Sequence, residues 1–405
     1  MKTLFSREGA PALAAGGALA LSVVSIASSQ ILLGLAIILT IRAWRSAAYP
    51  RGSYLLLVFA ALTVAAVLAS PSPAAGFPQI KKFFVYLIVP CIAAAYGGPD
   101  FARGVFAGIG VGGGLSAAWG FIQYARKYNA ADTSGVPFTQ FYIDNRITGF
   151  MSHWMTFGGT MMCVSLLAAA YVLFHRPVRW RIAVLAVLAV LAINLAWTRG
   201  ILIGTLAGGL YLIFRWRPAF VLATPFLAIG GFFVLPEAEK SRVVSIVRPR
   251  GELDSNSHRV ALLRTGIEMI KGNALLGVGP EHIKYEFERY APESVPRPVP
   301  RHWYIGHLHN IYVQFAADRG IPAMLAIIGF LIWNLWSIAC ARGGPETQLM
   351  LHGVAAFLIG VLVAGGFEHN LADSEILALT LGALTIGARL AQDSSTTTAI
   401  AKPSV

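Results

Sequence analysis

Two histidines and three arginines stand out in this 405-residue chain as residues whose types and positions suggest chemistry. His307 and His309 lie in a polar stretch between apolar segments. A neutral imidazole near physiological pH can take a proton from a hydroxyl group. Arg199, Arg259 and Arg264 carry planar guanidinium groups, which donate paired hydrogen bonds to phosphate. Together these residue types predict proton transfer beside an anionic group.

The histidines by themselves do not indicate a metal site. They are two positions apart and have no third ligand nearby, whereas a zinc site takes at least three protein ligands. The three cysteines, Cys91, Cys163 and Cys340, all fall within apolar runs, so neither a metal cluster nor a disulfide framework is indicated. We predict no metal and no cofactor.

The composition is that of a membrane protein. Hydrophobic residues make up 56% of the chain and charged residues only 13%, whereas about 25% charged is usual in soluble domains. Apolar runs of roughly 17 to 25 residues recur, which is the length that a helix needs to cross a bilayer. Such runs are too long for barrel strands. The sequence therefore predicts an all-α, polytopic membrane protein with about twelve transmembrane helices.

Nine predicted spans precede one long polar stretch, and three follow it. They cover residues 10–27, 31–44, 54–69, 83–96, 105–124, 150–174, 182–197, 201–214, 219–235, 321–340, 349–367 and 376–390. The domains predicted from them are a membrane part over 1–235, a loop over 236–320, a second membrane part over 321–391 and a tail over 392–405. The first span is expected to stay uncleaved, because apolar sequence resumes at once at Ile31.

The distribution of basic residues predicts the orientation. Short connections on the side of both chain ends carry more Lys and Arg than those on the opposite side, so both termini are expected in the cytoplasm. The long polar loop then faces outward. Many basic residues of this chain, whose net charge is +13, face outward as well. They predict contact with anionic membrane lipids or with an anionic substrate held in the membrane.

Two other functional classes are disfavoured. Nucleic acid is a poor partner, because aromatic residues are spread through the spans and the basic residues face outward. Nucleotide hydrolysis is not expected, because no phosphate-binding Gly-rich loop is present. The run Gly112-Gly113-Gly114 lies inside a span and indicates close helix packing.

The long polar loop is predicted to fold into a lid. Ser257 is expected to cap a helix over residues 257–271, in which apolar residues recur at helical spacing. A turn at 277–280 precedes a second helix over 281–290, and four prolines then favour an extended chain. His309 lies about one turn before the next helix.

Three short motifs follow one another in a fixed order. They are Thr198-Arg199-Gly200 at a span end, Arg259 before Gly277-Val278-Gly279, and His309-Asn310-Ile311-Tyr312 leading to Gly320. In a chain with about twelve spans and one large loop near its carboxyl end, this order resembles the bacterial O-antigen ligase and polymerase superfamily. A common family pattern places an aromatic residue four positions after the loop arginine, where this chain has Leu263.

The resemblance implies an inverting, metal-independent glycosyl transfer on the periplasmic face of the bacterial inner membrane. As in an O-antigen ligase of lipopolysaccharide biosynthesis, the donor would be a glycan on undecaprenyl diphosphate, and the acceptor a hydroxyl of the lipid A-core. His309 would be the catalytic base, and the arginines would bind the diphosphate, with Arg264 the weaker member. Supporting residues would be His307, Asn310, Asp373, Lys81 and Lys82.

Three alternatives remain open on the sequence. A polymerase or a protein O-oligosaccharyltransferase of the same superfamily would handle the donor in the same way. A transporter of lipid-linked glycan is a different class, and it would need ionisable residues buried at mid-span. The charged residues of this chain cluster at the ends of the spans instead, which favours catalysis at the membrane surface.

Overall fold

The computed structural model describes residues 9–223, 233, 240, 255–300 and 303–400. Within these ranges every regular element is an α-helix or a 3₁₀ helix. Seven helical segments are long and apolar enough to cross a membrane, and three shorter apolar helices accompany them. The prediction of an all-α, polytopic membrane protein is confirmed. The ninth predicted span, 219–235, lies largely outside the described residues, so the count of twelve stays a prediction.

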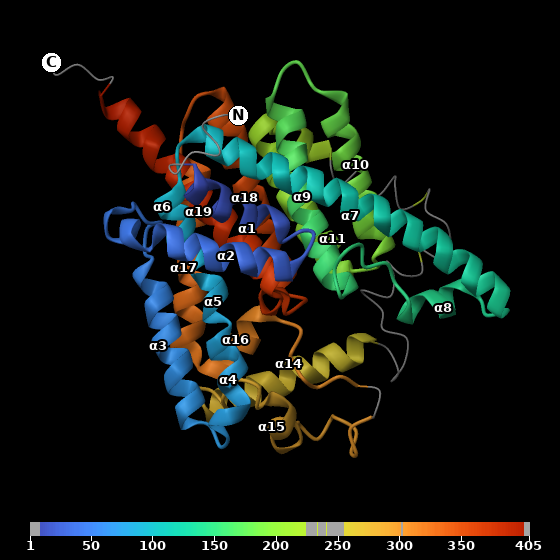
Figure 1. The fold of residues 1–405 in the computed structure, drawn as a ribbon. Helices are drawn as coiled ribbons and strands as arrows, with labels where there is room; N and C mark the ends of the chain where they lie inside the picture. The colour runs from blue at the N-terminus through green and yellow to red at the C-terminus, as the bar shows by residue number, and fades with distance from the viewer. Residues whose placement is uncertain (1–8, 224–232, 234–239, 241–254, 301–302, 401–405) are drawn as a thin grey trace.

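The helices before the lid are shown from blue to green in Figure 1. They are α1 (Ala10–Leu21), α2 (Ile26–Thr40), η1 (Ile41–Ser46), α3 (Tyr54–Ala69), α4 (Pro73–Lys81), α5 (Phe83–Tyr86), α6 (Ile88–Ala95), α7 (Pro99–Ser134), α8 (Phe138–Asp144), α9 (Trp154–Phe174), α10 (Trp180–Leu195) and α11 (Arg199–Trp216). The lid and the last helices are α14 (Ser255–Gly272), α15 (Ile283–Tyr290), α16 (Ile311–Arg319), α17 (Ile321–Cys340), α18 (Pro345–Gly365), η2 (Asn370–Ala372) and α19 (Ser374–Ile400).

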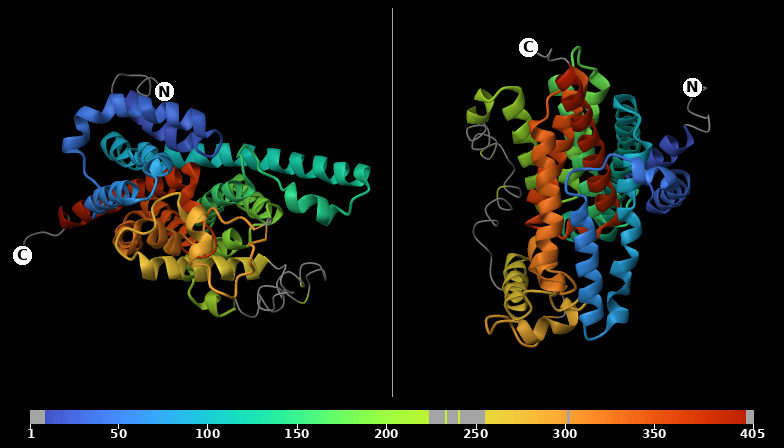
Figure 2. Two further views of the ribbon diagram at one scale, coloured as in Figure 1. Left: turned by 90° about the horizontal axis from the view of Figure 1, so that it is seen from below. Right: turned by 90° about the vertical axis from the view of Figure 1, so that its left-hand side faces the viewer.

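The first helix is shorter than the sequence predicts. Helix α1 has 12 residues, which at roughly 1.5 Å per residue is about 18 Å and less than the roughly 30 Å of a hydrocarbon core. It pairs with α2, and both run across the direction of α3 and α17 (Figures 1 and 2). The predicted first span therefore ends at Leu21, and a turn rather than a continuous helix leads to Ile26.

Two further boundaries differ from the prediction. The fourth span begins at Pro73, ten positions before the predicted start, and is a broken run of α4, α5 and α6. Helix α7 continues to Ser134, past the predicted end at Tyr124. The extension is rich in Ala, Arg and Lys, which favour helix, and Gly135 ends it in the left-handed conformation. The connection expected at 125–148 is thus partly helical.

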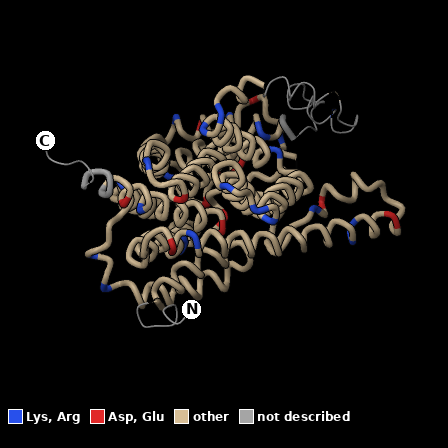
Figure 3. The backbone as a smooth tube through the Cα atoms, turned by 90° about the horizontal axis from the view of Figure 1, so that it is seen from above, with Lys and Arg blue, Asp and Glu red and all other residues tan. Residues whose placement is uncertain are grey.

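Helix α18 is the centre of the packing that carries the site. It contacts α9, α11, α17 and α19. Figure 3 shows that most of the backbone belongs to uncharged residues, with Lys, Arg, Asp and Glu at scattered positions. Helices α11 and α18 approach closely, because a side chain at Gly204 would overlap the Gly360 carbonyl. Small residues at such contacts allow two backbones to meet in a membrane protein. The amino end of α11 is thereby fixed beside the carboxyl end of α18.

The lid has a small hydrophobic core of its own at one end of the bundle. Helices α14 and α15 lie below the long helices in Figure 1 and in the right-hand view of Figure 2. Their buried apolar residues include Leu262, Met269 and Phe287. The two predicted lid helices are present, but α14 begins at Ser255. Ser257 is therefore inside the helix, and the prediction that it caps the amino end is wrong.

Gly320 allows the lid to pack closely against the start of a membrane helix. Gly320 links α16 to α17 with φ +86°, and a Cβ atom there would overlap the Leu275 carbonyl. We expect Gly320→Ala to reduce the stability of the protein by roughly 2–5 kcal/mol, through backbone strain and overlap. The measurement is the unfolding temperature of the purified protein in detergent. Gly329→Ala is the control, since its Cβ would meet nothing within 4 Å. Equal unfolding temperatures for both variants would contradict this prediction.

Candidate active site

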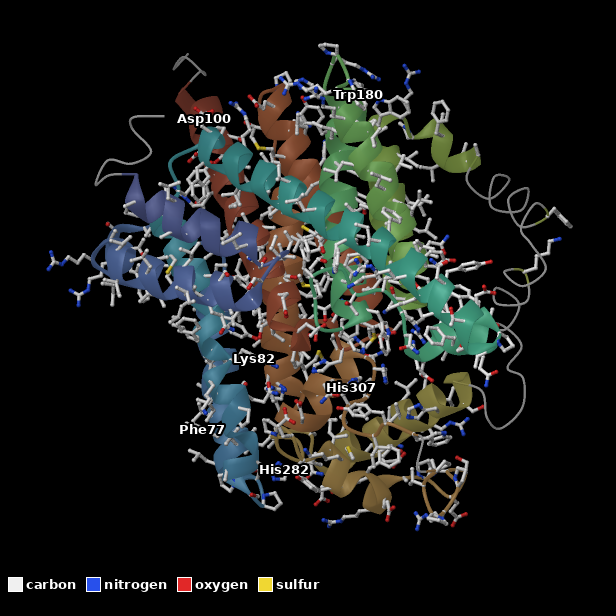
Figure 4. The ribbon with its side chains drawn as sticks, turned by 45° about the vertical axis from the view of Figure 1, so that its right-hand side comes forward. Phe77, Lys82, Asp100, Trp180, His282 and His307 are labelled. Carbon is white, nitrogen blue, oxygen red and sulfur yellow. The ribbon has the colours of Figure 1, made fainter. Side chains whose placement is uncertain are left out.

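Four segments meet between the lid and the long helices. They are the first turns of α14, the loop 303–310, the loop 366–373 after α18, and the amino end of α11. Figure 4 places His307 and Lys82 in this zone, whereas Asp100 and Trp180 lie toward the opposite end of the molecule. The predicted histidine pair and two of the predicted arginines, Arg199 and Arg259, therefore lie at a junction of segments distant in sequence.

Glu368 is the residue that joins these segments. One carboxylate oxygen accepts a hydrogen bond from His309 Nδ1 at 3.0 Å, and the other pairs with Arg259 at 2.6 Å. Arg259 also donates to the Phe367 carbonyl at 3.0 Å. The Glu368 side chain is only 4% exposed, against 16% for His309 and 36% for Arg259. The structure thus brings together His309 and Arg259 through one buried carboxylate.

The protonation of Glu368 follows from its two partners. Burial alone would raise the pKa of this carboxyl group. The hydrogen bond from His309 and the positive charge of Arg259 outweigh burial, so the pKa lies below its usual value. Glu368 is therefore ionised at neutral pH and fixes Nδ1 of His309 as a hydrogen-bond donor, which leaves Nε2 available as an acceptor.

Arg199 lies at this same junction. It is the first residue of α11 and is exposed. The next residue, Gly200, packs directly on the loop after α18, because a Cβ atom there would lie 3.0 Å from Glu368 Cγ and from Phe367 Cβ. The amino end of α11 thus backs onto the carboxylate that holds His309. Free backbone N–H groups at a helix amino end favour an anion at this place.

A group of histidines surrounds His309. The ring centroid of His307 lies 4.2 Å from that of His309, and His369 lies 6.0 Å from His307. On the lid side, His258 lies 6.2 Å from His309 and stacks on Trp303. Burial, with a smaller effect of the neighbouring His309, lowers the pKa of His307 to about 4. Burial, followed by the charge of His307, holds the pKa of His369 well below its usual range. Both are neutral at physiological pH.

The backbone at His309 is held in an uncommon conformation. His309 has φ +49° and Trp197, two residues before Arg199, has φ +52°, in the left-handed region that residues other than glycine seldom adopt. Such conformations cluster at functional sites, where the surrounding structure must enforce them. Asn310 holds the backbone of its neighbour His309 in place. Its side chain accepts from two backbone N–H groups of α16 and donates to the Gly366 carbonyl at 3.0 Å. The expected supporting role of Asn310 is thus that of a helix cap.

Asp373 does not contact His309 in the structure. Asp373 is one of the supporting residues expected from the sequence, but Glu368 makes the contacts with His309 and Arg259. Asp373 instead accepts a hydrogen bond from Thr156 of α9 at 2.7 Å. Burial raises its pKa, and the Thr156 hydrogen bond opposes that shift only partly. Glu368, rather than Asp373, contacts His309 and Arg259, because Glu368 lies nearer the end of α18, which packs against α11.

The two predicted lysines, Lys81 and Lys82, have different surroundings. Lys81 is exposed and lies over the ring of Phe77. Lys82 is half-buried and lines a cavity together with His369 and Arg319. Of this pair, only Lys82 faces the interior near the histidines.

Arg259 and Arg264 give a direct test of the predicted anion site. Arg264 donates to the Ser294 hydroxyl at 3.4 Å and stays exposed, whereas Arg259 faces Glu368. A charge-assisted hydrogen bond contributes about 1.5–3 kcal/mol. We expect Arg259→Gln to weaken donor binding roughly tenfold and Arg264→Gln to change it little. Titration of the purified variants with a lipid-linked diphosphate measures this. Equal losses in both variants would contradict the assignment of Arg259.

The part of the chain that the structure describes contains no group of three or more His, Cys, Asp or Glu side chains arranged to hold a metal ion. The absence of a metal from the chemistry stays a prediction.

Several residues of the site were not singled out from the sequence. Glu368 and His369 lie in the short loop after α18, in which Asp373 alone was predicted as a site residue. Arg319 follows Asp318 at the end of α16 and pairs with it at 2.6 Å. The available signal was a run of charged and histidine residues between two apolar spans, which predicts a functional loop but not its partners.

The fold and the site define a polytopic helical membrane protein. At one end of its bundle, the Glu368 carboxylate joins His309 to Arg259 of α14. Residues 155–328 match the family model described as O-Antigen ligase. The matched segment runs from α9 into α17 and contains Arg199, Arg259 and His309. No match to a curated protein was found.

Proposed function

We propose that the protein is an O-antigen ligase, which transfers a glycan from undecaprenyl diphosphate to a hydroxyl of the lipid A-core. The observation that carries this proposal is the single buried carboxylate of Glu368, which holds both His309 and Arg259. It orients a base beside an anion-binding group, and glycosyl transfer from a diphosphate needs both.

His309 acts as the base in this mechanism. Its Nδ1 donates to the ionised Glu368, so Nε2 accepts the proton of the acceptor hydroxyl. The hydroxyl oxygen attacks the anomeric carbon as the bond to the diphosphate oxygen breaks, and one direct displacement inverts that centre. Glu368 stabilises the imidazolium that forms. Its charge does so most effectively because the group is buried and pre-positioned.

The arginines act on the leaving group. Arg259 on the lid donates to the Phe367 carbonyl of the Glu368 loop, and Gly200, which follows Arg199, packs on the same loop. They would bind the diphosphate and offset the negative charge that grows on it as the glycosidic bond breaks. The energy of the diphosphate ester drives the transfer, in keeping with the expectation that nucleotide hydrolysis is not used.

The orientation of the chain agrees with this assignment. The start of α1 and the end of α19 lie toward the end of the bundle opposite the lid (Figures 1 and 2). With both termini in the cytoplasm of a bacterial inner membrane, the lid and the site face the periplasm, where lipid-linked glycan and lipid A-core meet. The loop over residues 236–320 would then be a periplasmic lid domain between two sets of spans.

A polymerase of the same family is the second candidate, because the family match covers both activities. The decisive experiment is reconstitution of the purified protein with lipid-linked glycan and either lipid A-core or a second lipid-linked glycan. Product on the core supports the ligase, and lengthened lipid-linked chains support the polymerase. Movement of the glycan lipid across the bilayer without a new bond would overturn both.

A further inference from the structure

The turn over residues 196–198 sets the place of Arg199. It is all that separates the end of α10 at Leu195 from Arg199, the first residue of α11. Trp197, in the middle of the turn, has φ +52°, a backbone conformation that a residue with a Cβ atom seldom adopts. Such a conformation persists only where neighbouring groups hold it. Because the turn is short, any displacement of it moves the amino end of α11, and Arg199 with it.

Tyr142 of α8 holds this turn at its start. Its hydroxyl group donates a hydrogen bond to the Leu195 carbonyl at 2.8 Å and accepts one from the Ile147 N–H at 3.3 Å. The Leu195 carbonyl belongs to the last turn of α10, where carbonyl groups have no partner within the helix. The ring of Tyr142 also meets the ring of Trp197 edge-on, with 4.9 Å between their centroids. One side chain thus contacts both the residue that ends α10 and the left-handed residue of the turn.

Tyr142 is itself fixed by its neighbours. Its side chain is fully buried. Its ring stacks on Phe138 at 4.9 Å and meets Tyr124 of α7 edge-on at 5.3 Å, as distances between centroids. Helix α8 packs beside the carboxyl end of α7 (Figure 1). A ring packed on several sides keeps one orientation, so the hydroxyl group of Tyr142 has a fixed position from which to hold the end of α10.

Helix α9 restrains the other end of the turn. Thr198 is only 5% exposed, and a Cβ atom at Gly158 of α9 would lie 2.7 Å from Thr198 Oγ1. Such a close approach leaves the turn little room to move toward α9. The backbone that leads into α11 is therefore held at both ends, by Tyr142 at Leu195 and by α9 at Thr198.

We propose that Tyr142 is a positioning residue for Arg199. Its hydroxyl group and its ring fix the turn over residues 196–198, so that the amino end of α11 presents Arg199 to the diphosphate of the donor. Tyr142 acts through Arg199 and not by contact with the donor. The proposal deepens the proposed function, and it rests on that function for the identity of the anion that Arg199 binds.

The test uses the full chain in neutral detergent, with farnesyl diphosphate as a probe that carries no glycan. Its binding is measured by titration for the wild type, Tyr142→Phe, Arg199→Gln and the double variant, at a temperature where all of them are folded. We expect Tyr142→Phe to weaken binding about threefold to tenfold, the effect of one lost hydrogen bond. In the Arg199→Gln background the same change should have no further effect, because the group that Tyr142 positions is absent.

Tyr49→Phe is the matched control. The Tyr49 hydroxyl group donates to the Trp44 backbone carbonyl at 2.8 Å, the same distance as in the bond from Tyr142, but it lies between η1 and α3. This variant should bind the probe like the wild type. Trp197→Gly is a second variant of the turn itself. It removes the ring that Tyr142 contacts, and it should weaken binding only while Arg199 is present.

The outcomes separate this proposal from the proposed function. Equal losses from Tyr142→Phe in both backgrounds would overturn the positioning role, because the hydroxyl group would then act on the fold and not through Arg199. Wild-type affinity in Tyr142→Phe, or the same loss in Tyr49→Phe, would overturn it as well. Failure of the diphosphate role gives a different result, in which the wild type does not bind the probe or Arg199→Gln binds it equally well, and both proposals then fall. The probe carries no glycan, so the outcome is the same for a ligase and for a polymerase.

Discussion

His309→Ala is expected to reduce glycan transfer by roughly 10²–10⁴-fold, the range that a general base contributes, while donor binding stays close to that of the wild type. The reason is that Nε2 of His309 is the acceptor for the hydroxyl proton, whereas the diphosphate is bound by arginines. Initial rates with purified lipid-linked glycan and lipid A-core, alongside a donor titration, measure both quantities.

The matched control for this variant is His175→Ala. His175 follows the end of α9, where its ring packs on Tyr171, and it belongs to none of the segments that meet at Glu368. It should transfer glycan like the wild type. Near-normal transfer by His309→Ala, with the protein folded and donor bound, would remove His309 from the role of base.

Glu368→Gln is expected to lower the rate of transfer almost as far, by roughly 10²–10⁴-fold. Loss of the carboxylate that orients a catalytic histidine has an effect of about 10⁴ in the Ser-His-Asp enzymes. Glutamine keeps the volume but removes the charge that stabilises the imidazolium. Its amide also presents a donor to the guanidinium of Arg259. The affected quantity should be kcat more than KM, which steady-state kinetics with varied acceptor will separate.

The same substitution predicts a pH dependence of stability. The folded-state pKa of Glu368 is lowered, so its ionised form stabilises the native state above the unfolded pKa of about 4.3. That contribution is lost as pH falls through the folded-state value. Wild type should therefore unfold at a higher temperature than Glu368→Gln at neutral pH, and the difference should shrink in acid. Glu346→Gln, which breaks an exposed pair with Arg103, is the control and should show little difference at either pH.

Much of the fold was predictable because lipid imposes simple rules. A run of apolar residues such as 321–340 has few structures available to it in lipid besides a helix, and α17 covers those residues. The length of an apolar run did not reveal where a helix turns or breaks. Helix α1 ends at Leu21 although the following Ser22-Val23-Val24 is apolar enough to continue, since helix α2 folds back on it. Pairing between helices, rather than hydropathy, sets that boundary.

The site was predictable in its residue types and only partly in its geometry. The chemistry of imidazole and guanidinium groups led to His309 and Arg259, which the structure joins. The choice of Asp373 over Glu368 shows the limit, because both acids lie in one short loop and hydropathy treats them alike. Only the packing of α18 on α11 decides which one faces the base. Lys81 and Lys82 differ for the same reason, since one helical step separates an exposed position from a buried one.

The position of Glu368 also sets when the protein can begin to work. Its partners Arg259 and His309 precede it by 109 and 59 residues, and it enters the structure with the last helical hairpin, α18 and α19. The segment that matches the family model ends at residue 328, before this carboxylate. A nascent chain that has inserted every helix up to α17 thus holds its base without an orienting charge. On the proposed mechanism, such a chain is expected to transfer no glycan until α18 and α19 have been inserted.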